Sequence, residues 1–216
     1  MTILEQLDCN LEKGGLFTLV SNFGSGKTTI LTIIASELVL AGKNVVYMNS
    51  EEAPKTLQKK FNNLLPLTQE IKGKLIIKKS TNAIGYLNNT LEEEKDIDVV
   101  ILDGYFGNKE NIKELAVIKN IAIIETKQLE RALKGVLTQA STQLKFMDRS
   151  DVVVNLVRDY EFKPLTVGEK LKNALCFWKA RIVENELLKL AALKNRTGKS
   201  GVILEYPINF GKINKL

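Results

Sequence analysis

Short apolar runs alternate along the chain with longer segments in which apolar residues recur at helical spacing. Residues 27–40 predict a helix, and Leu57, Phe61 and Leu64 recur with the period of another helix that begins near Pro54. Strands that alternate with helices predict an α/β fold, in which a mostly parallel β-sheet is flanked by helices on both faces. The runs that predict the strands are 16–20, 45–48, 74–77, 99–102, 121–124 and 152–157.

The C-terminal third of the chain has a less regular pattern. Residues 134–149 contain Gly, Ser and Thr with few large apolar side chains, and we interpret them as a mobile loop. Residues 202–206 alternate as a strand does, and they follow a predicted turn at 196–201. The periodicity of 186–193 is compatible with a strand or a helix, and the segment 160–185 matches no pattern that we can assign.

The composition is that of an ordinary globular domain. The 216 residues are 44% hydrophobic and 26% charged, which predicts a single domain over 1–216. The net charge of +6 and the pI near 9.1 favour a polyanionic partner such as nucleic acid. The basic residues are spread along the chain, so this preference is mild.

The residue types exclude several kinds of site. The chain has no histidine, and Cys9 and Cys176 are far apart with no C-x-x-C pair. A zinc site and histidine-based acid–base catalysis are therefore excluded, and a reduced cytoplasmic setting fits. No run approaches the roughly 18 apolar residues of a membrane span, and the first residues lack the pattern of a signal peptide.

The most informative segment is a Gly-rich turn between the first predicted strand and the helix at 27–40. It reads S-N-F-G-S-G-K-T-T, in the strand, turn and helix context of a phosphate-binding P-loop; Ser21 replaces the first glycine of the G-x-x-x-x-G-K-[ST] pattern. The alternative is a surface turn rich in Gly and Ser. We expect a nucleoside triphosphate to bind here through backbone N–H groups, Lys27 and the helix N-terminus. The predicted nucleotide-binding residues are Ser21, Asn22, Phe23, Gly24, Ser25, Gly26, Lys27, Thr28 and Thr29.

Carboxylates end two of the predicted strands. Asp103 follows the aliphatic run 99–102, so it could hold a water of a Mg²⁺ shell opposite the Thr28 hydroxyl. Glu51 or Glu52 ends another strand and could orient and partly deprotonate an attacking water. The alternatives are an Asp-Gly turn at Asp103 and, for the glutamates, a solvated first helical turn in which acidic residues favour the dipole.

The order and spacing of several segments resemble the RecA-like ATPases and, among them, the DnaB-type replicative helicases. The resemblance runs from about residue 10 to residue 212. The family's second strand with its catalytic glutamate is similar to G-K-N-V-V-Y-M-N-S-E-E at 42–52, where Glu51 is the closer match. Its Walker B strand is similar to V-V-I-L-D at 99–103. Its sensor strand, next strand and terminal hairpin are similar to the segments at 121–133, 148–159 and 193–204.

The resemblance implies roles for residues outside the P-loop. Gln128 would be the sensor glutamine that couples nucleotide state to DNA-binding loops, with Arg131 following it in the pattern. Lys194 and Arg196 would form the Lys-x-Arg of a C-terminal β-hairpin that reaches the γ-phosphate on a neighbouring subunit. Such proteins assemble as homo-oligomers, and residues 1–13 are the segment of this sequence that could supply an inter-subunit linker.

The predicted loop at 134–149 is the expected place for nucleic acid. A sequence-independent motor binds phosphates, so we expect single-stranded DNA to contact Lys134, Lys145 and Arg149, with Arg131 at the loop entrance. The alternative interpretation is a solvated basic loop on a slightly basic protein.

Three functions are compatible with these patterns. The first is a Mg²⁺-dependent ATPase that forms a ring or filament on single-stranded DNA, most simply a minimal DnaB-like helicase motor with a primase or loader protein as a further partner. The second is a recombinase-like or KaiC-like ATPase in which nucleotide controls assembly without strand separation. The third is a nucleotide-bound loader or regulator with slow or absent hydrolysis. All three use ATP and Mg²⁺ at the same site.

Overall fold

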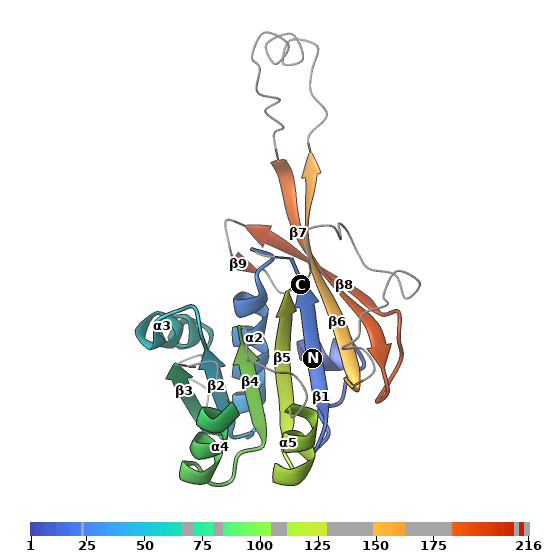
Figure 1. Ribbon diagram of the computed structural model, residues 1–216. Helices are drawn as coiled ribbons and strands as arrows, with labels where there is room; N and C mark the ends of the chain where they lie inside the picture. Colours follow the sequence, from blue (N-terminus) through green and yellow to red (C-terminus); the bar gives the residue numbers. More distant parts are fainter. Residues whose placement is uncertain are drawn as a thin grey trace, which may run out of the picture.

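One continuous sheet organises the part of the chain that the structure describes. The computed structural model describes residues 1–22, 24–65, 71–79, 84–104, 112–128, 149–162, 183–209 and 212–213. The strands are β1 (Leu16–Ser21), β2 (Val45–Asn49), β3 (Leu75–Lys79), β4 (Val99–Asp103), β5 (Ala122–Gln128), β6 (Val152–Phe162), β7 (Val183–Asn195), β8 (Ile203–Asn209) and β9 (Lys212–Ile213). The helices are α1 (Ile3–Gln6), α2 (Lys27–Leu40), α3 (Pro54–Leu64), α4 (Ile84–Glu93) and α5 (Ile112–Lys119). Side by side, the strands follow the order β3-β2-β4-β5-β1-β6-β7-β8-β9 (Figure 1).

The first six strands of this order are parallel, and β7, β8 and β9 add to the sheet in antiparallel pairs. In register, Ser21 at the end of β1 lies opposite Gln128 of β5 and Leu156 of β6. Asn49 at the end of β2 lies opposite Asp103 of β4. The carboxyl ends of the parallel strands therefore form one edge of the sheet, which is where ligands bind in open α/β sheets.

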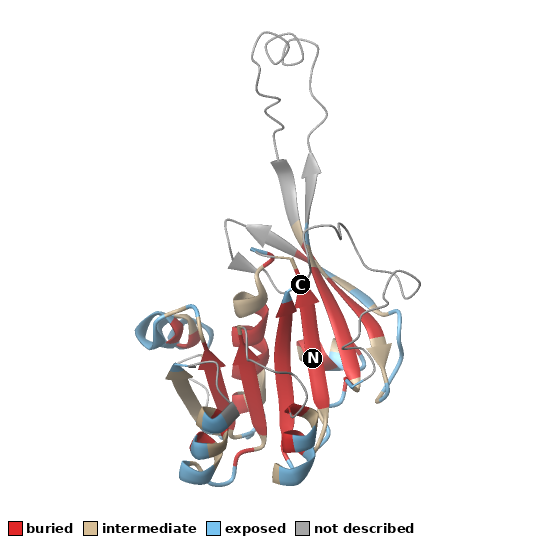
Figure 2. Cartoon of the chain, viewed as in Figure 1, coloured by how far each residue is buried: buried red, intermediate tan, exposed pale blue. Residues whose placement is uncertain are grey.

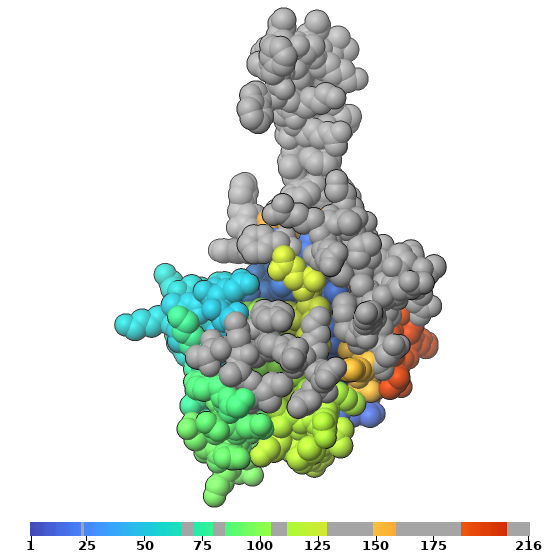
Figure 3. All heavy atoms as spheres, viewed as in Figure 1, coloured from blue at the N-terminus to red at the C-terminus, as the bar shows by residue number. Residues whose placement is uncertain are grey.

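Helices cover both faces of the sheet. One apolar cluster joins the sheet to α1, α2 and α3, and the other joins the opposite face to α4 and α5. The central strands are buried along their whole length (Figure 2), as expected for a parallel sheet whose strands are continuous β-branched and aliphatic runs. In the space-filling view, α4 and α5 occupy the lower part of the visible face and α3 lies at its side (Figure 3). Within the described residues, no helix is long and apolar enough to cross a membrane.

The sequence patterns predicted most of these elements, and the α/β expectation is confirmed. Helix α2 has the predicted bounds, and Pro54 occupies the first turn of α3, where a missing N–H costs nothing. The undecided segment 186–193 is strand, because it lies within β7, which pairs with β6 and with β8. The turn at 196–201 joins β7 to β8, so the C-terminal hairpin is present. The predicted loop at 134–149 lies outside the described residues apart from Arg149.

The N-terminal segment packs against its own chain. Thr2 and Glu5 form a capping box on α1, and the side chains of Ile3 and Leu7 are buried in the core shared with α2. The N–H of Ile3 donates to Oε2 of Glu37 on α2 at 2.9 Å. Most apolar side chains of the segment considered as an inter-subunit linker thus pack within the chain, although Met1 is exposed. A linking role for 1–13 stays a prediction.

Candidate nucleotide site

The Gly-rich turn follows β1 directly and ends at the first residue of α2. Gly24 and Gly26 have φ angles of 73° and 87°, which a residue with a side chain rarely adopts. The carbonyl oxygen of Asn22 accepts hydrogen bonds from the Ser25 hydroxyl at 2.7 Å and from Lys27 Nζ at 3.2 Å, so the turn closes on itself. Because Gly26 is the N-cap of α2, no side chain caps the first turn of that helix. Its N–H groups can bind an anion.

All predicted nucleotide-binding residues except Phe23, which lies outside the described residues, are placed around this turn. Burial lowers the pKa of Lys27, and the negative charges of Glu51 and Asp103 oppose that effect. The same charges show that both carboxylates lie close enough to the ammonium group to act on it. The lysine, the turn and the carboxylates of Glu51 and Asp103 therefore lie near one another, and their roles toward a nucleotide stay predictions.

Asp103 is buried at the end of β4 and accepts several hydrogen bonds. Its Oδ2 accepts from the Tyr47 hydroxyl at 2.8 Å and from Asn49 Nδ2 at 2.6 Å. Burial raises the pKa of this carboxyl, whereas hydrogen bonds from Thr28, Tyr47 and Asn49 act to lower it. The hydrogen bond from Thr28 brings together the two residues predicted to serve a metal ion. Tyr47 and Asn49 both come from the neighbouring strand β2.

The residues at this point fit a magnesium ion. Thr28 and Asp103 offer hydroxyl and carboxylate oxygens, and Mg²⁺ prefers such ligands while keeping waters and phosphate oxygens in its shell. Two protein oxygens are sufficient for a metal held chiefly by a nucleotide. Neither here nor elsewhere in the described ranges do three or more His, Cys, Asp or Glu side chains form a group that could hold a metal by themselves.

The two glutamates after β2 have different surroundings. Both backbone N–H groups donate to Asn49 Oδ1, at 2.8 Å for Glu51 and 2.5 Å for Glu52. The carboxylate of Glu52 forms an ion pair with Lys60 of α3 at 2.5 Å. Glu51 is exposed, and its charge acts on Lys27 and on Asp103. Because the carboxylate of Glu52 is paired with Lys60, Glu51 is the stronger candidate to act at the phosphate turn.

Arg158 is a candidate that the sequence patterns did not reveal. It lies on β6, two residues beyond Leu156, which is opposite Ser21 in register. Its guanidinium donates to the carbonyl oxygen of Gly24 at 3.4 Å. A second cation therefore lies at the phosphate turn. Gln128, the predicted sensor, is the exposed last residue of β5 at the same edge.

Arg196 lies at the opposite edge of the sheet, and Lys194 lies nearer the middle of the strands. Lys194 is paired with Val153 at the start of β6, and the Arg196 N–H donates to the Asp151 carbonyl oxygen at 2.9 Å. The guanidinium of Arg196 forms an ion pair with Asp151 at 3.5 Å, and the Arg196 side chain is 58% exposed. Through Val153, Lys194 is level with Thr18 in the middle of β1, whereas Arg196 is bonded to Asp151, whose own N–H donates to Leu16 at the start of β1. At ~3.3 Å per residue, the path along β1 from Leu16 to Ser21 puts Arg196 roughly 17 Å from the phosphate turn of the same chain.

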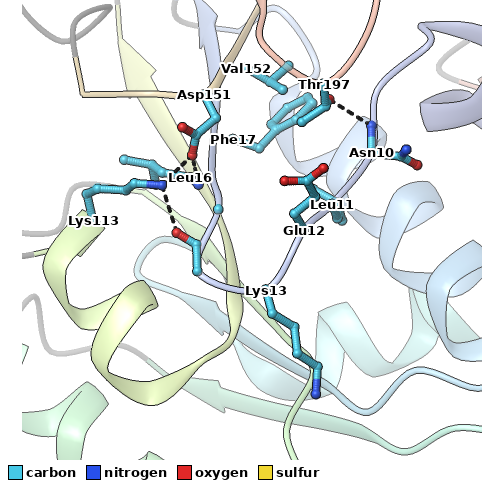
Figure 4. A pocket seen from close by; sticks show the side chains of 12 residues that line it. Asn10, Leu11, Glu12, Lys13, Leu16, Phe17, Lys113, Asp151, Val152 and Thr197 are labelled. Atoms are coloured by element: carbon cyan, nitrogen blue, oxygen red, sulfur yellow. Dashed lines mark hydrogen bonds and ion pairs between the residues drawn. The ribbon is translucent and has the colours of Figure 1, made fainter.

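A surface pocket also lies at this opposite edge (Figure 4). Segment 10–17 lines it together with Lys113, Asp151, Val152 and Thr197. Lys113 donates to Asp151 at 2.5 Å and to the Gly14 carbonyl oxygen at 2.7 Å. Burial acts to raise the pKa of Asp151, but the Lys113 hydrogen bond and the neighbouring cations hold it below its usual value. These charges are already paired, so we assign the candidate site to the phosphate turn and not to this pocket.

Of the predicted DNA-contacting residues, the structure describes one. Arg149 is exposed just before β6. Arg131, Lys134 and Lys145 lie outside the described residues. Contact between this loop and DNA stays a prediction.

Known proteins resemble this chain in fold, but their sequences are only weakly similar to it. No model of a known protein family matches the chain. A solved structure of a DnaB-like replicative helicase, described together with its interactions with primase, superposes with a TM-score of 0.62 at 13% identity. The match covers 95% of this chain and 60% of the helicase chain. The chain is also 26% identical to ABC transporter G family member 1 of Dictyostelium discoideum over 80 residues. These 80 residues are 37% of this chain and 10% of the transporter.

The likeness to the helicase structure concerns the fold alone. The helicase comparison, together with the sheet order, shows the mixed α/β fold that the RecA-like resemblance implied. The chain spans less than two thirds of the length of either protein, so their activities and partners are not transferred with the fold.

The contact between Tyr47 and Asp103 gives a stability prediction. The Tyr47→Phe variant keeps the ring, which packs edge to face on Phe61 at 5.3 Å, and removes one donor to a buried carboxylate. We expect the free energy of unfolding to fall by about 1–2 kcal/mol, measured by urea denaturation. Tyr86→Phe on α4 is the matched control. Equal midpoints for the Tyr47→Phe variant and the unmodified protein would show that the hydrogen bond does not support the fold.

Proposed function

We propose that this chain is a Mg²⁺-dependent ATPase that acts on DNA, most simply a minimal helicase motor that assembles on single-stranded DNA. The observation that carries the proposal is the convergence of Lys27, Thr28, Glu51 and Asp103 at the carboxyl edge of the parallel sheet. The RecA-like resemblance and the helicase fold support DNA as the partner. The basic net charge agrees with this assignment.

Each residue has a defined task in the proposed hydrolysis. Lys27 and the N–H groups of the turn bind the β- and γ-phosphates, and Thr28 with Asp103 would hold Mg²⁺, whose charge neutralises the phosphate oxygens. Glu51 accepts a proton from the attacking water while the water oxygen bonds to the γ-phosphorus. The bond from that phosphorus to the bridging oxygen breaks, and ADP leaves with the electron pair.

Assembly is part of the proposal, because Arg196 lies far from the phosphate turn of its own chain. A guanidinium suits a phosphate that is approached across an interface, and a planar donor can bind two of its oxygens. We therefore propose that Arg196, supported by Lys194, contacts ATP bound by an adjacent copy in a ring or filament. A primase is a further proposed partner by analogy with the helicase, and a loader protein is proposed from the family resemblance.

The Glu51→Gln variant is expected to bind ATP and to hydrolyse it about 100-fold more slowly or worse, because an amide keeps the shape of the carboxylate but accepts no proton. Binding is measured by the nucleotide-dependent rise in melting temperature, and turnover by phosphate release. Glu52→Gln is the matched control and should stay active, since Glu52 is paired with Lys60. The reverse result would assign the base to Glu52.

Hydrolysis measured with and without single-stranded DNA, beside a strand-displacement assay, tests the function as a whole. Hydrolysis stimulated by DNA with displacement of a paired strand supports the helicase motor. Stimulated hydrolysis without displacement indicates a recombinase-like or KaiC-like ATPase. Nucleotide binding with neither activity indicates a loader or regulator and overturns the proposed reaction.

A further inference from the structure

The turn that carries Arg196 is held by the N-terminal segment of the same chain. Asp8 accepts hydrogen bonds at two atoms: its carbonyl oxygen from Asn195 Nδ2 at 2.8 Å, and its Oδ2 from the Lys199 N–H at 2.8 Å. The Asn10 N–H donates to the Thr197 hydroxyl at 3.1 Å, a contact visible in Figure 4. Asp8 and Asn10 thus make three hydrogen bonds to the turn, to residues that precede and follow Arg196.

Asn195 organises the turn from within. Its Oδ1 accepts from both the N–H and the hydroxyl of Thr197, at 3.0 Å and 2.9 Å. Its own N–H donates to the Ser200 hydroxyl at 3.1 Å. The fit against Asp8 is close: a Cβ added at Gly198 would lie 1.9 Å from the Asp8 carbonyl oxygen, which is backbone and cannot rotate away. The turn is therefore packed against this segment too closely for a side chain at position 198.

This arrangement fixes the backbone of Arg196 and leaves its side chain accessible. The Arg196 N–H donates to the Asp151 carbonyl oxygen, while the side chain, whose guanidinium pairs with the Asp151 carboxylate, is more than half exposed. At its other end the N-terminal segment is anchored to α2, the helix that follows the phosphate turn, through Ile3 and Glu37. It is also anchored to β8, where the Tyr206 hydroxyl donates to Gln6 Oε1 at 2.9 Å.

We propose that Asp8 and Asn195 are positioning residues for Arg196: they hold the turn in the geometry that presents its guanidinium to ATP bound by a neighbouring copy. The inference rests on the proposed function. A guanidinium that is misplaced by about 1 Å can lose on the order of 100-fold in rate, so a turn held on both sides matters to catalysis although neither residue touches the nucleotide.

Two substitutions at Asp8 distinguish the hydrogen bond made by its carboxylate from the conformation of its backbone. Asp8 has a φ of 55°, which Gly and Asn both tolerate. Asp8→Gly removes the carboxylate without adding strain, whereas Asp8→Asn keeps an oxygen that can accept from the Lys199 N–H. We expect Asp8→Gly to lower kcat at least 10-fold with little change in KM, and Asp8→Asn to restore most of the rate.

A mixing experiment shows on which copy the defect acts. Copies with Asp8→Gly retain an intact phosphate turn, and copies with Lys27→Ala retain an intact Arg196 turn. If Asp8 positions Arg196, adding Lys27→Ala copies to co-assembled Asp8→Gly copies restores hydrolysis. Equal rates for Asp8→Gly and the unmodified protein, or co-assembled mixtures without recovery, would overturn the inference.

Arg196→Ala is measured in parallel, so that a failure of the positioning role can be told apart from a failure of the proposed function. Normal hydrolysis by Arg196→Ala would contradict the proposed trans contact itself. A loss in Arg196→Ala with none in Asp8→Gly contradicts only the positioning role. If Asp8→Gly melts below the assay temperature, Thr197→Val replaces it and tests the contribution of Asn195. It removes the hydroxyl that donates to Asn195 Oδ1 and accepts from the Asn10 N–H, and the same outcomes apply.

Discussion

The Lys27→Ala variant is expected to lose on the order of 10⁴-fold in kcat/KM for ATP. The substitution removes a charged hydrogen-bond donor to the β- and γ-phosphates in the ground state, and a fixed charge where negative charge develops in the transition state. Together these losses raise the free energy of the transition state, relative to free enzyme and free ATP, by about 5–6 kcal/mol. The neighbouring carboxylates of Glu51 and Asp103 add to the loss, because their charge would no longer be balanced.

Steady-state phosphate release measures this effect, and the rise in melting temperature with added ATP measures binding. Lys43→Ala is the matched control, since Lys43 is exposed just beyond the C-terminal end of the same helix. Binding should weaken in the Lys27→Ala variant alone. Undiminished turnover in that variant would show that the Gly-rich turn does not hold the triphosphate.

The Arg196→Ala variant is expected to bind ATP normally and to hydrolyse it on the order of 10³-fold more slowly. The reason is that a guanidinium supplied across an interface stabilises the charge of the transition state and contributes little to ground-state binding. Lys199→Ala serves as the control, because Lys199 is exposed in the same turn and uses its backbone N–H for the contact with Asp8.

Mixtures of Arg196→Ala and Lys27→Ala copies test whether the contact is made between chains. Each variant alone should be inactive, and co-assembled mixtures should regain part of the activity at interfaces where an intact phosphate turn meets an intact Arg196. A mixture that stays inactive although both variants demonstrably co-assemble would contradict the contact. Size-exclusion chromatography of differently tagged copies provides the check on assembly.

The sequence predicted the parts of the site that depend on local chemistry. The Gly-rich turn could be recognised because its glycines, Lys27 and Thr28 are adjacent in the chain. Asp103 could be recognised because it ends a run of aliphatic residues. Such signals need no knowledge of which strands are neighbours.

The sequence could not predict features that depend on strand order. Tyr47 reaches Asp103 because β2 lies beside β4, and Arg158 reaches the phosphate turn because β6 pairs with β1 and continues past its end. A tyrosine within a buried strand did offer one usable signal, since its hydroxyl needs a partner. The strand character of 186–193 comes from pairing on both sides, which periodicity does not record.

The separation of the phosphate turn and Arg196 along the sheet has a consequence for how the rate depends on concentration. If Arg196 acts on ATP bound by another copy, as we propose, a single copy lacks part of its site. Hydrolysis per copy should then fall on dilution, as the population of paired copies falls. Any scaffold that gathers copies raises their effective concentration and so accelerates hydrolysis. A DNA strand that binds several copies side by side would therefore stimulate turnover by mass action alone, without altering the geometry of any single site.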